Sequence, residues 1–453
     1  MGSSTGYSAL VFRAGAFERL RVALLADAPL ETAAFILARS ARVADSRWRL
    51  IVKEIVPLHD ADYARRTESS VELHASALAN VTKRARAENL TLLLAHTHTV
   101  PGSVGPSWID RQGETAWVPA VRRRVPDVPH GRLIVGETSA HAAIIHEDGS
   151  EHGLRVMEVG DDVIVIADCC EPADTPEPRM HRQALAFGSD GQRRLEALHF
   201  AIVGAGGTGS VVGQQLAHLG AREFTLVDLD LVEESNLNRL VGATGNDVGR
   251  AKVDVLGDLI AIVQPRAHIR AIRGDICDAE VARKLLACDF FFCCTDSEGS
   301  RAVLNQFAYQ YWLPGIDLGV AIRVRKEQVT HISGRVQMLT PGQACLLCAE
   351  VLDPEQVRRD LLTDEARAQD RYIDGAFVPQ PSVISINSAA ASLAVTMMLS
   401  AVTGVPVGTR NQRIRFEAGI VSRVAVDSRT SCPVCSPLGA LGRADSFDPP
   451  GRR

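Results

Sequence analysis

The chain has 453 residues, of which 46% are hydrophobic and 23% charged, the composition of a folded protein with large cores. At about 150 residues per domain, this length leaves room for two large domains or three smaller ones. Lys and Arg total 49 against 54 Asp and Glu, so the formal net charge is -5. No broad basic surface is implied, and we expect no nucleic-acid partner.

The N-terminus and the cysteines indicate the compartment. The opening MGSSTGYSAL lacks the charged start and apolar run of a signal peptide. None of the 10 cysteines precedes Cys169, which is unlike the disulfide framework of a secreted chain. We therefore expect a cytoplasmic protein. The uncharged stretch 375–409 resembles a membrane span, but its apolar part, 389–402, is short for a bilayer and predicts a buried helix.

Residues 8–167 predict an α/β domain, because β-like runs such as WRLIVKEIV alternate with helix-like stretches such as 71–88. His96 and His98 end one apolar run, so both imidazoles project from the same face of a strand. Asp110 adds a carboxylate soon after. Such a set leaves the fourth position on zinc open for water, as in catalytic sites. The alternative is a chance pair of histidines on a strand.

A metal-bound water also needs a base, and Glu31, the lone acid between apolar segments, is a candidate. This pattern resembles the JAB/JAMM metalloproteases, which cleave bonds after the C-terminal glycine of ubiquitin-like proteins. The resemblance implies that His96, His98 and Asp110 bind zinc and that Glu31 activates the water. It also implies that Ser107 stabilises the tetrahedral oxyanion. The gap between His98 and Ser107 is one residue longer than the common family spacing.

The composition changes after the first domain. Residues 168–180 are rich in Pro and charge without apolar periodicity, which predicts a linker. Residues 181–440 form the second predicted domain, in which a strand, a glycine turn and a helix open a doubly wound parallel sheet. Residues 441–453, rich in Gly, Pro and Arg, predict a flexible tail.

The glycine turn predicts a nucleotide site. Gly204, Gly206 and Gly209 lie between the strand and the helix, where the backbone can approach phosphate oxygens. Asp228 ends the next strand and can bind a ribose hydroxyl, with Asp230 close behind it. These residues alone do not separate NAD from ATP.

Later residues favour ATP and adenylation. Arg239 and Lys252 follow an acid-rich turn that contains Asn236, and such cations suit a triphosphate. Asp296 ends another apolar strand, at the sheet edge where a carboxylate can hold Mg²⁺. The alternative for any one of them is a solvated ion pair.

Together these residues resemble the ThiF/MoeB-like superfamily of ubiquitin-activating enzymes over roughly residues 178–437, with a Rossmann-like fold. The resemblance implies the following contacts: ribose with Asp228, ATP phosphates with Asn236, Arg239 and Lys252, and Mg²⁺ with Asp296. Arg182 matches the arginine segment of the family, where it would reach the ATP of a partner subunit. A homodimer is therefore expected.

Two Cys-x-x-Cys pairs predict a second, structural zinc ion. Cys345, Cys348, Cys432 and Cys435 can supply four thiolates to a closed tetrahedral site, and the family has a zinc knot at these places. A redox pair is the alternative.

Conjugating relatives pass the adenylated tail to a cysteine, but residues 349–386 contain none, and Arg371 stands where several relatives have one. Cys293 and Cys294 lie in an apolar strand that predicts inert packing. Cys169 and Cys170, in the linker, are expected to be more exposed, and neither pair is predicted as the nucleophile.

The sequence thus predicts a bifunctional enzyme with ATP, Mg²⁺ and two zinc ions. One domain adenylates the C-terminal glycine of a ubiquitin-like protein, and the other trims or deconjugates that protein. Such fusions resemble bacterial ubiquitin-like conjugation systems associated with phage defence, with a ubiquitin-conjugating-type carrier enzyme as a further partner. The alternatives are activation of a sulfur carrier for thiocarboxylate formation, and a dimeric scaffold without catalysis.

Overall fold

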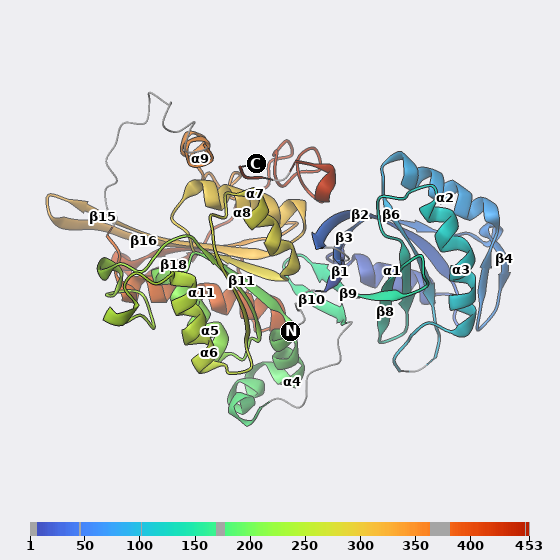
Figure 1. Ribbon diagram of the computed structural model, residues 1–453, viewed down its shortest axis with the longest axis horizontal. Helices are drawn as coiled ribbons and strands as arrows, with labels where there is room; N and C mark the ends of the chain where they lie inside the picture. Colours follow the sequence, from blue (N-terminus) through green and yellow to red (C-terminus); the bar gives the residue numbers. More distant parts are fainter. Residues whose placement is uncertain are drawn as a thin grey trace. The chain divides into compact units, whose positions relative to one another are not determined.

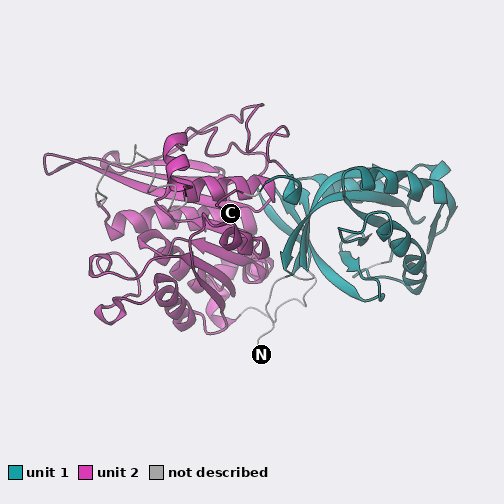
Figure 2. Cartoon of the chain, turned by 45° about the horizontal axis from the view of Figure 1, so that its top comes forward, with its two compact units in different colours: residues 1–172, 442–448 teal, residues 173–441, 449–453 magenta. Residues whose placement is uncertain are grey.

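The computed structural model describes residues 7–44, 47–100, 102–168, 177–362, 381–448 and 450–452. The chain divides into two compact units (Figure 2). Unit 1 comprises Met1–Pro172 and Gly442–Asp448, and unit 2 comprises Ala173–Leu441 and Pro449–Arg453. Both combine helices with a sheet, so the predicted α/β class is confirmed.

Unit 1 is built on a sheet that closes on itself. Its strand order is β1-β3-β2-β6-β7-β8-β9-β10, and β1 also pairs with β9. That pairing joins seven strands in a ring and leaves β10 beside β9. The strands are β1 (Ser8–Arg13), β2 (Ala33–Ala44), β3 (Arg47–Pro57), β6 (Thr91–Thr97), β7 (Gly131–Val135), β8 (Ala140–Ile145), β9 (Glu151–Val159) and β10 (Val163–Ala167).

Alternate residues of the central strands face two different hydrophobic clusters, as the two-residue period of a strand requires. Ile36 and Leu93 belong to the cluster that includes α1 (Ala16–Leu25). Phe35 and Leu92 belong to the cluster that includes α2 and α3. The remaining elements are α2 (Ala75–Ala87), α3 (Trp108–Arg122), a 3-10 helix (Asp60–Asp62) and the hairpin of β4 (Tyr63–Arg66) and β5 (Val71–Leu73).

Unit 2 is doubly wound. Its strand order is β13-β12-β11-β14-β15-β16-β17-β18, and the first five of these are parallel. The strands are β11 (His199–Val203), β12 (Glu223–Asp228), β13 (His268–Arg273), β14 (Phe290–Cys293), β15 (Gly315–Arg325), β16 (Gln328–Leu339), β17 (Asn411–Arg415) and β18 (Ile420–Arg423). From β11 the chain moves outward to β13 and then returns to β14 on the other side. Ligands of such sheets bind at this switch, outside the carboxyl ends of the strands.

Helices cover both faces of this sheet, with α8 on one face and α5, α6 and α11 on the other (Figure 1). The helices are α4 (His181–Ala197), α5 (Gly207–His218), α6 (Lys252–Val263), α7 (Ala279–Arg283), α8 (Glu298–Gln310), α9 (Pro354–Asp360) and α11 (Ile384–Thr403). Short 3-10 helices of unit 2 occupy Pro178–Met180, Glu234–Asn236, Gly245–Asp247, Lys284–Ala287 and Phe416–Ala418, and a further one, Ala444–Ser446, belongs to unit 1.

One described helix, α11, has the length and composition of a membrane span, with a mean hydropathy of 1.5 over a window that is 50% buried. It packs against α4, α5, β15 and β16. Its buried residues include Ala390, Ala394 and Met398, so α11 is a core helix of unit 2. This agrees with the buried helix expected for residues 389–402.

The C-terminal residues have defined contacts, although their composition predicts a flexible tail. In unit 1, the backbone amide of Arg42 donates to Asp445 Oδ2 at 3.0 Å. In unit 2, Arg452 Nε donates to Asp278 Oδ1 at 3.1 Å, and the same two residues form a β-bridge. Composition shows that Arg452 is charged, but it does not show that Arg452 pairs with the carboxylate of Asp278.

Candidate nucleotide site and metal centres

The glycine turn lies between the end of β11 and the start of α5. Gly204 has a φ of +93°, and a Cβ on it would lie 2.7 Å from the carbonyl oxygen of Cys294. A Cβ on Gly209 would lie 1.8 Å from the carbonyl oxygen of Gly204. Gly206 differs, because a Cβ there would meet nothing within 4 Å. The turn is therefore tightly packed at Gly204 and Gly209 and open at Gly206, where a phosphate can approach the start of α5.

Asp228, at the end of β12, holds this turn. Its Oδ2 accepts a hydrogen bond from the amide of Ala205 at 2.7 Å, and its Oδ1 accepts one from the amide of Asp230 at 2.8 Å. Burial raises the pKa of Asp228, and the two amides and Lys252 oppose that effect. A carboxylate has about four acceptor sites, so capacity remains for a ribose hydroxyl.

The cations lie along the same edge of the sheet. Lys252 Nζ donates to Asp230 Oδ2 at 2.7 Å. Arg239 Nη1 donates to the carbonyl oxygen of Ser235 at 2.6 Å. The Cγ atom of Arg239 lies 3.4 Å from the Cβ position at Gly207, which places this side chain beside the start of α5. Asn236 is 8% exposed, and its Oδ1 accepts from the amide of Glu233, so it caps a 3-10 turn.

The predicted Mg²⁺ ligand follows β14 on a segment that touches the glycine turn. The Cβ position at Gly204 lies 3.0 Å from the amide nitrogen of Thr295, the residue before Asp296. Asp296 is exposed and makes no ion pair or hydrogen bond with other described residues. An exposed carboxylate at this edge suits a hydrated Mg²⁺ ion. Arg182 is an exposed residue in the first turn of α4, and its predicted role toward a partner subunit stays a prediction.

Asn387, in the first turn of α11, was not predicted as a site residue from the sequence. Its Nδ2 lies 2.5 Å from the Cβ position at Gly207 and donates to Ser382 Oγ at 2.9 Å. The side chain is 5% exposed. A buried amide in an apolar helix was the available signal, but its neighbour in the glycine turn is remote in sequence.

The three predicted zinc ligands of unit 1 come together from β6 and α3. His96 Nε2 lies 3.1 Å from Asp110 Oδ1, and His98 Nε2 lies 3.2 Å from Asp110 Oδ2. One atom from each of the three side chains lies within 4.8 Å of the others. His96 Nδ1 is buried without a hydrogen-bond partner among the described residues, while its Nε2 is paired with Asp110 Oδ1. Two imidazoles and a carboxylate that converge in this way fit a zinc ion with one open position.

Glu31 and Ser107 adjoin this cluster. Glu31 Oε1 lies 3.8 Å from His98 Nε2, and burial raises the pKa of Glu31 to about 7. Burial also acts to raise the pKa of Asp110, but its contacts with His96 and His98 outweigh burial and hold it well below its usual range. Ser107 caps α3, because its Oγ accepts from the amide of Asp110 at 3.2 Å. As an acceptor, this hydroxyl orients the helix that carries Asp110, and its O–H can still donate to an oxyanion.

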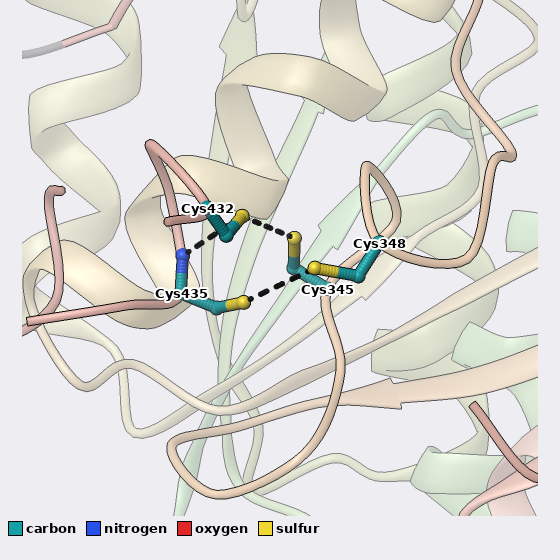
Figure 3. A group of neighbouring side chains, drawn as sticks. All are labelled: Cys345, Cys348, Cys432 and Cys435. Atoms are coloured by element: carbon teal, nitrogen blue, oxygen red, sulfur yellow. Dashed lines mark hydrogen bonds between the residues drawn. The ribbon is translucent and has the colours of Figure 1, made fainter. Parts of the chain in front are cut away.

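The four predicted cysteines of unit 2 form one buried cluster (Figure 3). Cys345 Sγ lies 3.6 Å from Cys432 Sγ, and Cys348 Sγ lies 3.5 Å from Cys435 Sγ. These separations exceed the ~2.05 Å of a disulfide bond, and all four thiols are free. Backbone amides donate to two of the sulfurs, from Arg429 to Cys348 at 3.3 Å and from Cys435 to Cys432 at 3.5 Å. The cluster is consistent with a structural zinc ion.

Cys293 is unsuited to nucleophilic catalysis. It is fully buried in β14, and burial raises its pKa to about 12. Burial also raises the pKa of Cys294 well above its usual value. Thiolate formation at neutral pH is thereby suppressed. Arg371 and most of the crossover stretch lie outside the described residues.

The fold and site of unit 2 define an α/β nucleotide-binding domain with a four-cysteine cluster. The model of the ThiF family matches residues 180–434, more than half of the chain. The chain therefore belongs to the ThiF family, and residues 180–434 form its E1-like adenylyltransferase domain. This match begins after the candidate zinc site of unit 1.

Several relatives resemble the second unit. Molybdopterin-synthase adenylyltransferase of Escherichia coli (strain K12) is 31% identical over 182 residues, which cover 39% of this chain and 70% of the relative. The SAMP-activating enzyme E1 of Haloferax volcanii is 27% identical over 37% of this chain and 59% of its own length. Ubiquitin-like modifier-activating enzyme 5 of Oryza sativa subsp. japonica is 28% identical over 36% of this chain and 40% of its own length. The chain thus spans between 40% and 70% of these relatives.

One solved structure, E. coli MccB with ATP, superposes with a TM-score of 0.47 at 20% identity over 57% of this chain and 75% of that chain.

Proposed function

We propose that unit 2 adenylates the C-terminal glycine of a ubiquitin-like protein with ATP and Mg²⁺. The observation that carries this proposal is the gathering of Gly206, Asp228, Arg239 and the Asp296 segment at the switch point of a ThiF-family sheet. The relatives support the substrate class, since two of them are activating enzymes for a ubiquitin-like modifier and for SAMP, and a third is a molybdopterin-synthase adenylyltransferase.

In the proposed reaction, the glycine carboxylate of the substrate attacks the α-phosphate of ATP, and pyrophosphate leaves. Arg239 and Lys252 would neutralise the phosphates, and Asp228 would hold the ribose. Asp296 would hold Mg²⁺, which when bound shields the charge of the departing pyrophosphate. No general base is required, because a carboxylate is already ionised at neutral pH. Positioning and charge neutralisation then supply most of the rate.

The acyl adenylate has two possible fates. Residues 349–386 contain no cysteine, and Cys293 is buried with a raised pKa, so neither offers a thioester acceptor. In the proposed conjugation pathway, a separate carrier enzyme of the ubiquitin-conjugating type supplies the thiol. The second candidate, sulfur-carrier activation, is favoured by the same missing cysteine, and its product is a thiocarboxylate.

The proposal assigns to unit 1 a zinc-dependent cleavage after the glycine of the same ubiquitin-like protein. It rests on the cluster of His96, His98 and Asp110 with Glu31 beside it. When bound, zinc supplies a Lewis acid and an activated water. With zinc held by His96, His98 and Asp110, Glu31 would accept a proton from the attacking water and pass it to the leaving amine. Ser107 would cap α3, which fixes Asp110, and its O–H would help to stabilise the tetrahedral oxyanion.

The biological setting is part of the proposal. A homodimer would let Arg182 reach the ATP of the partner subunit. A cytoplasmic location suits two metal centres of which one needs reduced thiolates. A chain that combined the proposed adenylation with the proposed cleavage would suit a bacterial ubiquitin-like conjugation pathway linked to phage defence.

Two activities on one chain allow a crossed test. With a ubiquitin-like protein as the substrate, ATP–pyrophosphate exchange should require the terminal glycine and be lost in Asp296→Ala. Cleavage of a fusion after that glycine should be lost in Glu31→Gln and retained in Asp296→Ala. A non-catalytic scaffold would show neither activity, and retention of cleavage in Glu31→Gln would refute the assigned base. Detection of a thiocarboxylate instead of a thiol-sensitive adduct would select sulfur transfer.

A further inference from the structure

Three arginines of unit 2 surround a single carboxylate at the carboxyl edge of β14. Asp317 is fully buried and pairs with two of them. Arg301 Nε on α8 lies 3.1 Å from Asp317 Oδ1, and Arg335 Nε on β16 lies 2.9 Å from Asp317 Oδ2. Arg413 on β17 is the third. We call Arg301, Arg335, Arg413 and Asp317 the arginine cluster.

Strand register places Arg335 and Arg413 directly opposite each other. Gly319 on β15 is paired with Arg335, and Arg335 is paired with Arg413, so their side chains project from one face of the sheet. Like charges in such a pair repel each other. Burial and Arg335 both lower the pKa of Arg413, while Asp317 partly opposes them. The Arg413 guanidinium makes no ion pair or hydrogen bond within the part of the chain that the structure describes.

Gly319 makes room for the cluster. A Cβ on this residue would lie 2.9 Å from Arg301 Nη2 and 3.9 Å from Arg335 Nη2. A side chain at position 319 would therefore displace at least one guanidinium. The cluster itself holds three positive charges against one negative charge in a largely desolvated place. Asp296 lies within electrostatic reach of Arg301, so a net positive charge remains that an anion would balance.

The cluster lies next to the proposed site of adenylation. Asp317 is level with Cys293, the last residue of β14, and Gly319 lies beyond that end. Arg301 Nη2 donates to the carbonyl oxygen of Thr295 at 2.7 Å, one residue before the proposed Mg²⁺ ligand Asp296. The triphosphate already has the glycine turn, Arg239 and Lys252. The anion that still needs a partner at this edge is the carboxylate that is to be adenylated.

We propose that Arg413, with Arg335 beside it, binds a carboxylate of the substrate tail and brings it to the nucleotide. Guanidinium groups recognise carboxylates through two parallel hydrogen bonds, which fix orientation as well as charge. This inference rests on the proposed adenylation by unit 2. The carboxylate is either the terminal one or an acidic side chain of the tail, and the chemistry of recognition is the same.

Peptide binding to the full-length chain tests the proposal. Three synthetic ten-residue probes are used: one with a free terminal Gly-Gly carboxylate and no acidic side chain, its C-terminal amide, and an amide with one glutamate near its end. Arg413→Gln should weaken the free-carboxylate peptide at least fivefold, whereas Arg413→Lys should weaken it by a smaller factor. Arg415→Gln removes the same charge from an exposed position two residues further along β17, and should leave this affinity unchanged.

Each outcome decides a point. Equal losses in Arg413→Gln and Arg415→Gln, or no binding of any probe by the wild-type chain, would overturn the proposal. A loss confined to the glutamate amide would identify the acidic side chain as the source. Inorganic pyrophosphate is titrated in parallel, and a loss seen for it alone would also overturn the proposal. ATP affinity is measured on the wild-type sample: failure to bind ATP would count against adenylation, while the peptide results would still stand.

Discussion

Single glycines determine how closely a nucleotide can approach the turn after β11. Gly206 has open space around its Cβ position, so an alanine there can fold without a clash, yet its methyl group would project where a phosphate approaches. Gly206→Ala should therefore keep the melting temperature close to the wild-type value and lower ATP affinity at least tenfold. Calorimetry of unfolding and titration with ATP measure the two effects.

Gly113→Ala in α3 is the matched control, because its Cβ position also has no neighbour within 4 Å and lies in unit 1. Its ATP affinity should equal that of the wild type. An unchanged ATP affinity in Gly206→Ala would contradict the assignment of this turn to phosphate binding.

If both metal clusters bind zinc, substitutions in each cluster should remove a different zinc ion. The purified chain should contain about two zinc ions per chain, one in each ligand set. Asp110→Asn removes a charged ligand from the open site and should lower the content to one, with little change in protease resistance. Cys435→Ser should also remove one ion but leave residues near the C-terminus of unit 2 open to proteolysis. Elemental analysis gives the counts, and a wild-type content of one would eliminate one of the sites.

The sequence patterns predicted which side chains gather in the two metal clusters, because most of these side chains are close together along the chain. His96 and His98 share a strand face, and the four cysteines form two Cys-x-x-Cys pairs. Local backbone geometry therefore brings the members of each pair close together. Asn387 and Arg413 were missed because their partners, Gly207 and Arg335, come from distant segments. A lone Asn in an apolar helix or Arg in a strand is visible in the sequence, but it does not identify the distant residue that it meets.

At the scale of elements, an ion-pair network ties α3 to the sheet of unit 1. Arg132 on β7 is 1% exposed and donates to Glu114 Oε2 on α3 at 2.6 Å. It also pairs with Glu151 on β9. Glu114 lies one helical turn after Asp110, so this network supports the helix that carries the carboxylate ligand.

Arg132→Ala should destabilise unit 1 by about 3 kcal/mol, because it leaves Glu114 buried without a partner. Arg111→Ala is the control: Arg111 pairs with the same Glu151 from a side chain that is 56% exposed, and its loss should cost less than about 1 kcal/mol. Urea unfolding, followed by a spectroscopic signal from unit 1, compares the free energies of unfolding of the two variants. Equal effects would show that the network contributes no more than a surface ion pair.

The elements differ in how far their sequence determines them. The alternation along β2 and β6 and the buried runs of β11 and β14 have clear periods, and both sheets were expected. The ring closure in unit 1 was not, because the pairing of β1 with β9 joins segments from the two ends of the domain. Nothing in the sequence of β1 or β9 indicates which strand it pairs with.

At the scale of the whole molecule, the C-terminal residues contribute to both units. Deletion of residues 442–453 removes the bond between Arg42 and Asp445 in unit 1 and the pairs of Arg452 with Asp275 and Asp278 in unit 2. We expect the melting temperatures of both units to fall by a few degrees. Arg452→Gln should lower only that of unit 2. If the melting temperatures of both units were unchanged by the deletion, residues 442–453 would contribute nothing to the stability of either unit.

The closed ring of unit 1 has a consequence for protein engineering. β1 pairs in parallel with β3 on one side and β9 on the other, so no strand edge is free at that place. A truncation that removed β1 would create two exposed edges at once, each able to recruit a strand from another molecule. Chains shortened from the N-terminus should therefore aggregate once the deletion passes Ser8. Fusions placed before that residue leave the pairing of β1 with β3 and β9 intact.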